Sequence, residues 1–310
     1  MENQTVITEF ILLGLSRDPH LQVIFFLLFL MIFSVTLLVN SAIILVTRTD
    51  SNLQNPMSFF LSHLAFVDIC YSSVIVPKML ENIIGKQKTI SLEGCMAQSL
   101  LAFQVAGAEV FILAAMAYDR YMAICDPLHY TTIMKKEICR NLVSGAWAMG
   151  FLYSLVNALP LLNLHFCKSN IIDNYSCELP SVLALSCTQT LTNYIVLLIS
   201  VVVFGFSPFL FTLISYTYII ATILKIRSAE GRRKAFSTCS SHIIVVGLFY
   251  IAACFRYMKP SLESLIYLDK VVSIQYSILT PMLNPIIYSL KNKDIQNALA
   301  KMFGKCKFFK

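Results

Sequence analysis

The chain has 310 residues, of which 57% are hydrophobic and only 13% are charged. Soluble domains carry roughly 25% charged residues, so this composition excludes an ordinary water-soluble domain. The net charge of +7 would suit a nucleic-acid partner in a soluble protein, but no long run of like charges forms a nucleic-acid-binding arm. The composition therefore predicts a polytopic membrane protein.

Seven apolar segments follow one another along the chain, each with the roughly 20 residues that a helix needs to cross a hydrocarbon core of about 30 Å. We therefore expect an all-α fold, a single seven-transmembrane bundle over residues 1–310. The predicted spans are 22–47, 57–80, 96–125, 140–162, 192–226, 235–258 and 268–290. The fifth span is longer than lipid requires, so its end is expected to project into the cytoplasm.

The tail, residues 291–310, is expected to form a short amphipathic helix at the membrane surface. Ile295, Leu299, Met302 and Phe303 share one face at helical spacing, and lysines lie elsewhere. Cys306 follows this helix, where either a palmitoylated or an unmodified thiol fits the sequence.

Lysine and arginine positions predict the orientation. With residues 1–21 outside and 291–310 inside, 15 of these residues lie on the inner side and eight on the outer side, Arg120 being left out. The positive-inside rule then favours a plasma-membrane protein with an extracellular N-terminus and a cytoplasmic C-terminus. The sequons "NQT" and "NYS" fall on the outer side, and we expect a glycan at Asn3, leaving Asn174 open.

Four cysteines, Cys95, Cys167, Cys177 and Cys187, fall in outer segments, where disulfides persist. Four cysteines allow three pairings, and spacing alone does not choose among them.

Two pairs of charged residues interrupt the apolar segments. Asp119 and Arg120 end the third span, and Arg120 lies 25 residues after Cys95, about 37 Å along a helix, which places it at the cytoplasmic edge. Neighbouring residues on a helix do not face each other well, so a static ion pair is a poor account of them.

Asp68 and Glu109 lie within spans, where acids are costly and usually functional. They would repel each other unless one is protonated or a cation lies between them, and a hydrogen-bonded neutral acid that packs helices is the alternative.

The third-span motif "MAYDRYMAIC" followed by "DPLHY" resembles the signature of the olfactory (odorant) receptors, in the tetrapod-type (class II) branch of the rhodopsin-like G-protein-coupled receptors. "PMSFFLSHLAFVD" resembles the family's second-span motif, "SY" at Ser215–Tyr216 the end of its fifth span, and "KAFSTCSSH" the start of its sixth. "PMLNPIIYSLKNKD" resembles the seventh-span motif. The resemblance covers essentially the whole chain in the right order.

The resemblance implies roles for several residues. Arg120, in the Asp119–Arg120–Tyr121 motif, would meet the G-protein α-subunit and be restrained by Asp119 at rest. Tyr216 and Tyr288 would be its partners in the active state. Disulfides are implied for Cys95–Cys177 and Cys167–Cys187. Asp68 and Glu109 resemble the two acids of an allosteric sodium site, with Asn284 nearby, and no other cofactor is implied.

A ligand site is expected between the outer halves of the third, fifth, sixth and seventh spans. Phe103, Gly107 and Val110 share one helix face at i, i+4 and i+7. Similarity to the family adds Asn157, Ser200, Phe204, Tyr250, Cys254, Tyr257 and Ser277. The resulting site is mostly apolar, as small-molecule sites tend to be.

Other residues limit the chemical classes of ligand that the site could bind. The upper third span, Met96–Ala108, has no acid to pair with an amine, and the seventh span has no lysine between Val271 and Leu290 for a retinal Schiff base. Arg256 either reaches the outer interface or pairs with an acidic odorant. His242 is interpreted as a packing residue and not as a metal ligand.

The sequence therefore predicts a receptor, not an enzyme. It would bind a small volatile odorant and activate a stimulatory olfactory-type G-protein, which raises cyclic AMP, and it would have no nucleic-acid partner. A chemosensory receptor of the same family outside the nose is the alternative. Two other classes fit poorly, because a transporter should show internal repeats and a membrane enzyme a cluster of catalytic groups.

Overall fold

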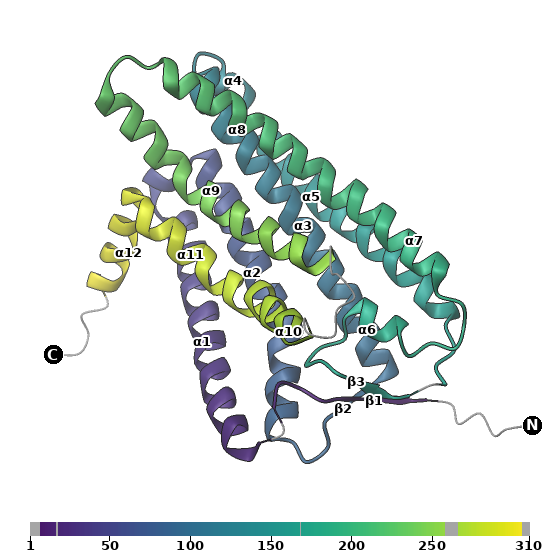
Figure 1. Cartoon of the computed structure of the whole chain (residues 1–310). Helices are drawn as coiled ribbons and strands as arrows, with labels where there is room; N and C mark the ends of the chain where they lie inside the picture. The colour runs from purple at the N-terminus through teal and green to yellow at the C-terminus, as the bar shows by residue number, and fades with distance from the viewer. Residues whose placement is uncertain (1–6, 17, 168, 258–265, 306–310) are drawn as a thin grey trace, which may run out of the picture.

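The computed structural model describes residues 7–16, 18–167, 169–257 and 266–305. Long helices run side by side, with a small sheet at one end of the bundle and the short helix α4 at the other (Figure 1). The long and C-terminal helical elements are α1 (Pro19–Thr49), α2 (Pro56–Ile84), α3 (Leu92–Cys125), α5 (Lys136–Ala158), α7 (Leu191–Ser200), α8 (Ser207–Lys225), α9 (Ala229–Tyr257), α10 (Ile266–Ile274), α11 (Thr280–Lys291) and α12 (Lys293–Lys305).

The fold is the helical transmembrane bundle that the sequence predicted, and each of the seven expected ranges is helical over its described residues. By length and hydropathy, five helical runs of the described residues can cross a membrane, or six if the two halves of α9, which meet at 43°, form one span. The range of the seventh expected span consists of α10, a π-helical segment and α11. A total of seven spans stays a prediction.

Lipid explains the outer surface of the bundle. Leu27 on α1 is 60% exposed, Leu38 is 69% exposed and Leu198 on α7 is 66% exposed. A water-soluble protein rarely leaves so much apolar surface uncovered, whereas lipid tails solvate it at no cost. The buried core lies inside, where Leu64 of α2 and Ile112, Leu113 and Met116 of α3 are almost fully covered.

Side chains and prolines mark the starts of several helices. Asp18, Asn55 and Ser91 accept hydrogen bonds from the first backbone N–H groups of α1, α2 and α3. Inside two spans, a π-helical segment, Val201–Phe206 or Gln275–Leu279, comes directly before a helix with proline at its second position. Because proline cannot donate a backbone hydrogen bond, the preceding turn is left to widen.

Helices α3 and α5 approach each other closely at a point where each has a glycine. A Cβ atom on Gly150 of α5 would lie 2.7 Å from the backbone nitrogen of Ala108, and closer still to the carbonyl oxygen of Gln104. A Cβ on Gly107 of α3 would lie 2.8 Å from the Cα of Gly150. Only hydrogen side chains let the two backbones meet at this crossing.

The sequence prediction missed a three-stranded sheet. Strand β1 (Glu9–Leu12) lies between β2 (Thr89–Ser91) and β3 (Ile171–Ile172), antiparallel to β2 and parallel to β3. We call these strands and the described residues of the loop 164–188, which includes the short helix α6 (Leu179–Leu183), the cap. The cap joins the N-terminal segment to loops that follow α2 and α5.

At the opposite end lie α4 (Tyr130–Ile133) and α12 (Figure 1). The described part of the tail, which ends at Lys305, is helical, as predicted. Its Ile295 is fully buried, and Leu299 and Met302 pack against the main core, so this face of α12 rests on the bundle. The side chain of Phe303, and all of Cys306, lie outside the described residues.

Candidate functional site

A cavity of about 360 Å³ lies inside the half of the bundle next to the cap. Its walls come from α2, α3, α5, α8, α9, both π-helical segments and the cap. Most of the lining is aromatic or aliphatic, and hydroxyl and amide groups are few. This volume falls in the range of small-molecule sites.

Seven of the ten residues expected to contact a ligand line this cavity. They are Phe103, Gly107, Val110, Phe204, Tyr250, Cys254 and Ser277. The remaining three do not lie among the lining residues that the structure describes. Ser200 donates a hydrogen bond of 3.0 Å to the Oδ1 of Asn157, and both side chains are buried, so these two polar groups satisfy each other behind the wall. The side chains of Tyr257 and Arg256 lie outside the described residues.

Sequence reasoning missed the contribution of the cap to this cavity. Residues Ser176, Cys177, Glu178 and Leu179 line it, although they come from a loop. The signal was present in Cys177, whose disulfide with Cys95 brings this stretch to the start of α3. Residues Tyr71 and Ile75 of α2 were missed as well.

An acid does face the ligand cavity, although the third span supplies none. Glu178 is among the lining residues, and its carboxylate accepts a 2.5 Å hydrogen bond from Ser273 of α10. Tyr175 also contacts the Oγ atoms of Ser273 and Ser277, at 2.7 and 2.8 Å. The sequence reasoning considered acids only in the third span, which has none between Met96 and Ala108, and so it missed Glu178.

The cysteine pairs of the structure are those that the family resemblance implied. Cys95 and Cys177 form one disulfide, with Cα atoms 5.4 Å apart, and Cys167 and Cys187 form the other, with Cα atoms 5.8 Å apart. The first bridge ties the cap to α3, and the second closes a loop within the cap.

Deeper in the bundle, three polar residues lie together. The Nδ2 of Asn284 on α11 donates a 3.0 Å hydrogen bond to the Oδ1 of Asp68, and the same side chain interacts with Glu109. All three side chains are buried. The second oxygen of Asp68, one oxygen of Glu109 and the Oδ1 of Asn284 have no hydrogen-bond partner among the described residues. Oxygen atoms left unpaired in this way suit a hard cation.

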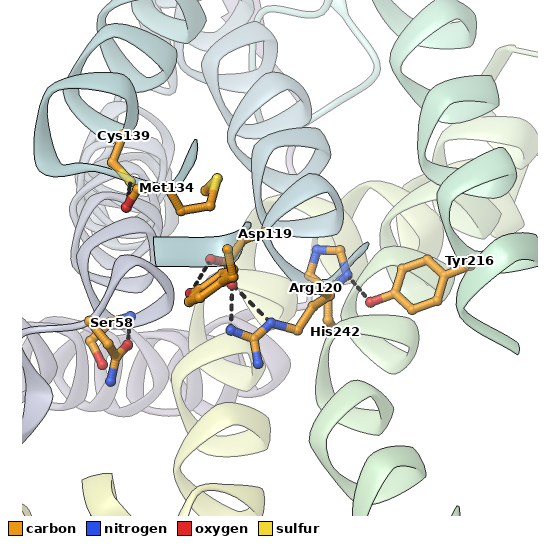
Figure 2. A network of polar contacts seen from close by, with 9 residues as sticks. Ser58, Asp119, Arg120, Met134, Cys139, Tyr216 and His242 are labelled. Carbon is orange, nitrogen blue, oxygen red and sulfur yellow. Dashed lines mark hydrogen bonds and ion pairs between the residues drawn. The ribbon is translucent and has the colours of Figure 1, made fainter. Parts of the chain in front are cut away.

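At the end of α3 away from the cap, Asp119 binds Arg120 directly (Figure 2). The Nε of Arg120 donates to the Oδ2 of Asp119 at 3.0 Å, and the Nη2 donates to the same atom. Although neighbouring residues on a helix do not face each other well, the two side chains pair here because the long arginine side chain folds back along the helix.

Tyr130 completes the coordination of Asp119. Its hydroxyl, on α4, donates to the Oδ1 of Asp119 at 2.8 Å. Burial, together with the negative charge of Asp119, raises the pKa of Tyr130, so this group stays a neutral donor. Asp119 itself is fully buried, and the Arg120 side chain is 12% exposed. Both carboxylate oxygens are thus occupied, and Arg120 is held in place.

The other residues of the expected switch have different partners. The Tyr216 hydroxyl lies 2.6 Å from the Nδ1 of His242 (Figure 2), and the Nε2 of that ring lies 3.0 Å from the carbonyl oxygen of Leu113. Because a carbonyl only accepts, Nε2 carries the proton and Tyr216 donates to Nδ1.

Tyr121 packs edge-on against Tyr218 at 6.1 Å between ring centroids. The hydroxyl of Tyr288 is buried and has no hydrogen-bond partner within the described part of the chain. The Tyr216 hydroxyl already has a partner, and the Tyr288 hydroxyl is buried. Each therefore needs a rearrangement before it can bind a new partner.

The second sequon, at Asn174, is buried in this fold, so we predict that it carries no glycan. Asn174 is 4% exposed, and its side-chain oxygen accepts a 2.7 Å hydrogen bond from the backbone N–H of Tyr175. The cap has no room for a glycan at this position. We expect Asn3→Gln to remove the shift that peptide N-glycosidase causes on a gel, and Asn174→Gln to leave it unchanged. A second glycan lost in the Asn174 variant would contradict the buried position of this residue.

The fold and these groups define a multi-pass helical membrane protein with a cavity near one end and a buried ion pair near the other. Comparison with known proteins is specific about the family. The family model "Olfactory receptor" matches residues 29–306. Human olfactory receptor 8S1 is 51% identical over 95% of this chain and 81% of its own length. Human olfactory receptor 5A1 is 49% identical over 99% of this chain and 98% of its own length, and mouse olfactory receptor 5AR1 is 45% identical over 98% of both. The chain belongs to the olfactory receptor family, a family of receptors and not of enzymes.

Proposed function

We propose that this receptor binds a small volatile organic ligand in its cavity and activates a stimulatory, olfactory-type G-protein, which raises cyclic AMP. The observation that carries the proposal is the mostly apolar cavity of about 360 Å³, because its lining includes seven residues that helical spacing or family similarity assigned to ligand contact. A cavity of this size and polarity suits a molecule with a hydrocarbon body and one or two polar groups.

In this proposal the cap faces the outside of the plasma membrane and α12 faces the cytoplasm. The two disulfides support this orientation, because disulfides persist in oxidising surroundings. The distribution of lysine and arginine supports it independently. The G-protein would then meet the end of α3 that carries Arg120.

In this proposal the hydrogen bonds of Asp119 belong to the resting state. With Arg120 and Tyr130 both bound to Asp119, the guanidinium is not available to a partner. A ligand that binds better to the open form of the bundle would shift the population toward it. Arg120 would then leave Asp119 and contact the G-protein, with Tyr216 and Tyr288 as its new neighbours.

A receptor expressed at the cell surface with a cyclic AMP readout tests the proposal against a panel of volatile alcohols, aldehydes, ketones, amines and acids. An agonist from the panel should lose its effect when Ala106, which lines the cavity, is changed to tryptophan, because the larger ring fills the space. Leu101→Trp is the matched control, since Leu101 lies on the same helix and is 44% exposed on the outside of the bundle. An agonist that keeps its potency in Ala106→Trp acts elsewhere.

We further propose that a sodium ion binds between Asp68, Glu109 and Asn284 and favours the resting state. The unpaired oxygens of the three buried side chains support this, because a cation would neutralise two nearby carboxylates and coordinate atoms that otherwise lack partners.

Replacing Glu109 by alanine should therefore remove the dependence of basal cyclic AMP on sodium. The measurement compares membranes in sodium chloride with membranes in the chloride of a larger organic cation at equal ionic strength. An undiminished sodium effect in the Glu109→Ala variant would rule out this site.

A further inference from the structure

The N-terminal strand β1 is the central strand of the cap. Leu92 donates its backbone N–H to the Thr8 carbonyl at 2.9 Å, on the β2 side. On the other side, Ile11 donates to Asn170 at 2.7 Å and Leu13 donates to Ile172 at 3.0 Å. Without β1, the strands β2 and β3 would have no partner in this sheet.

One face of β1 is buried against the cap. Phe10 is 0% exposed and Leu12 is 1% exposed, whereas Ile11 between them is partly exposed. The ring of Phe10 lies edge-on to Phe166, with 5.3 Å between centroids. Phe10 and Leu12 belong to one hydrophobic cluster with the disulfide of Cys95 and Cys177, so the strand and the bridge that anchors the cap to α3 share one packed core.

Cys177 of this bridge lies within the part of the cap that lines the ligand cavity, Ser176–Leu179. The backbone of Cys177 is held on both sides by α3, since its N–H donates to Gln98 Oε1 at 2.9 Å and its carbonyl accepts from Ser99 at 2.8 Å. Gln98 and Ser99 line the cavity too. Packing on Cys177 therefore bears on the shape of the cavity.

The chain leaving β1 is also fastened to the seventh expected span. Gly14 has a φ of +70°, a left-handed conformation that glycine adopts without strain. Its N–H donates to the Asn174 carbonyl at 3.2 Å, and its carbonyl lies 3.4 Å from the Nζ of Lys270 on α10. The same Lys270 binds Asp173 at 2.7 Å. The turn thus joins β1, the loop and α10.

We propose that β1 is a positioning element of the ligand cavity, in which Phe10 and Leu12 hold the stretch Ser176–Leu179 against α3. The inference rests on the proposed function for the meaning of the cavity, but not for its geometry. The N-terminal segment is then part of the binding site, although neither Phe10 nor Leu12 is among the residues that line the cavity.

Cys254 offers a probe of the cavity that needs neither a ligand nor a G-protein. It lines the cavity, and of the five cysteines free of disulfides in the described residues it alone is exposed. The test measures how fast a membrane-impermeant thiol reagent, trimethylammonium-ethyl methanethiosulfonate, modifies this thiol on intact cells. Cys254→Ser gives the background rate.

Phe10→Ala should raise the specific modification rate of Cys254 severalfold, because Ser176–Leu179 loses its support and opens more often. Ile11→Ala is the matched control on the opposite face of the same strand and should leave the rate unchanged. Equal rates in Phe10→Ala, Leu12→Ala and the unaltered receptor would overturn the proposal. If Phe10→Ala fails to reach the surface, Phe10→Leu takes its place. If neither does while Ile11→Ala does, β1 acts only in folding, and the proposal fails.

Agonist potency gives a second readout that separates positioning from simple instability. With an agonist from the volatile panel, Phe10→Ala should raise the half-maximal concentration while the maximal cyclic AMP response, corrected for surface level, is kept. A loss of maximal response with unchanged potency contradicts a positioning role. If no member of the panel activates the receptor but Phe10→Ala still raises the modification rate of Cys254, the proposed function fails and this inference stands.

Discussion

Replacing Arg120 by alanine should abolish the cyclic AMP response to an agonist while the receptor still reaches the cell surface. Arg120 is the only described cation that binds Asp119, and its removal takes away the group proposed to meet the G-protein. The fold should survive, because Asp119 keeps its hydrogen bond from Tyr130. The measurement is the cyclic AMP response at matched surface level, and an intact response in this variant would remove Arg120 from the proposed switch.

Arg140→Ala is a suitable control for that experiment. Arg140 lies on the first turns of α5, where it is exposed, so a loss of general positive charge would affect both variants alike. A response lost only in Arg120→Ala assigns the effect to the buried position. A response lost in both assigns it to the charge of the surface.

Replacing Gly150 by valine should have the largest effect on stability. The Cβ of any other residue would collide with the backbone of α3 at Gln104 and Ala108, and a backbone cannot rotate away as a side chain can. Overpacking of this kind costs about 3 kcal/mol or more when nothing can yield. We expect most of the receptor to be retained inside the cell and the purified remainder to melt at a lower temperature.

Gly145→Val is the matched control, because it makes the same change on the same helix. Nothing lies within 4 Å of a Cβ at Gly145, so only helix preference acts there, and it favours valine over glycine by roughly a few tenths of a kcal/mol. Similar melting temperatures for the two variants would mean that α3 and α5 do not cross closely at Gly150.

The helices were predictable because each needs a run of apolar residues long enough for lipid, and that pattern is local in sequence. The cap was not, since β1 has four residues and its partners Ser91 and Ile171 lie far along the chain. No periodicity marks so short a strand, and its pairing depends on the assembled bundle.

The ligand residues were predictable only in part, for a related reason. Helical spacing places Phe103, Gly107 and Val110 on one face, and all three line the cavity. It gives no information on a loop, so Glu178 was missed. Nor does it show that Asn157 and Ser200 bind each other. The pairing of Arg120 with Asp119 depends on a side-chain rotamer, which the spacing of two neighbours does not determine.

Formation of a complex with a stimulatory heterotrimeric G-protein tests the central claim most directly. Purified receptor with an agonist from the panel should retain the heterotrimer on a column, and a non-hydrolysable guanosine triphosphate analogue should release it. Arg120→Ala receptor, at equal loading, should retain none. The proposed function would be contradicted if the agonist-bound receptor retained no heterotrimer. It would also be contradicted if neither the nucleotide nor the Arg120 substitution changed the amount of heterotrimer retained.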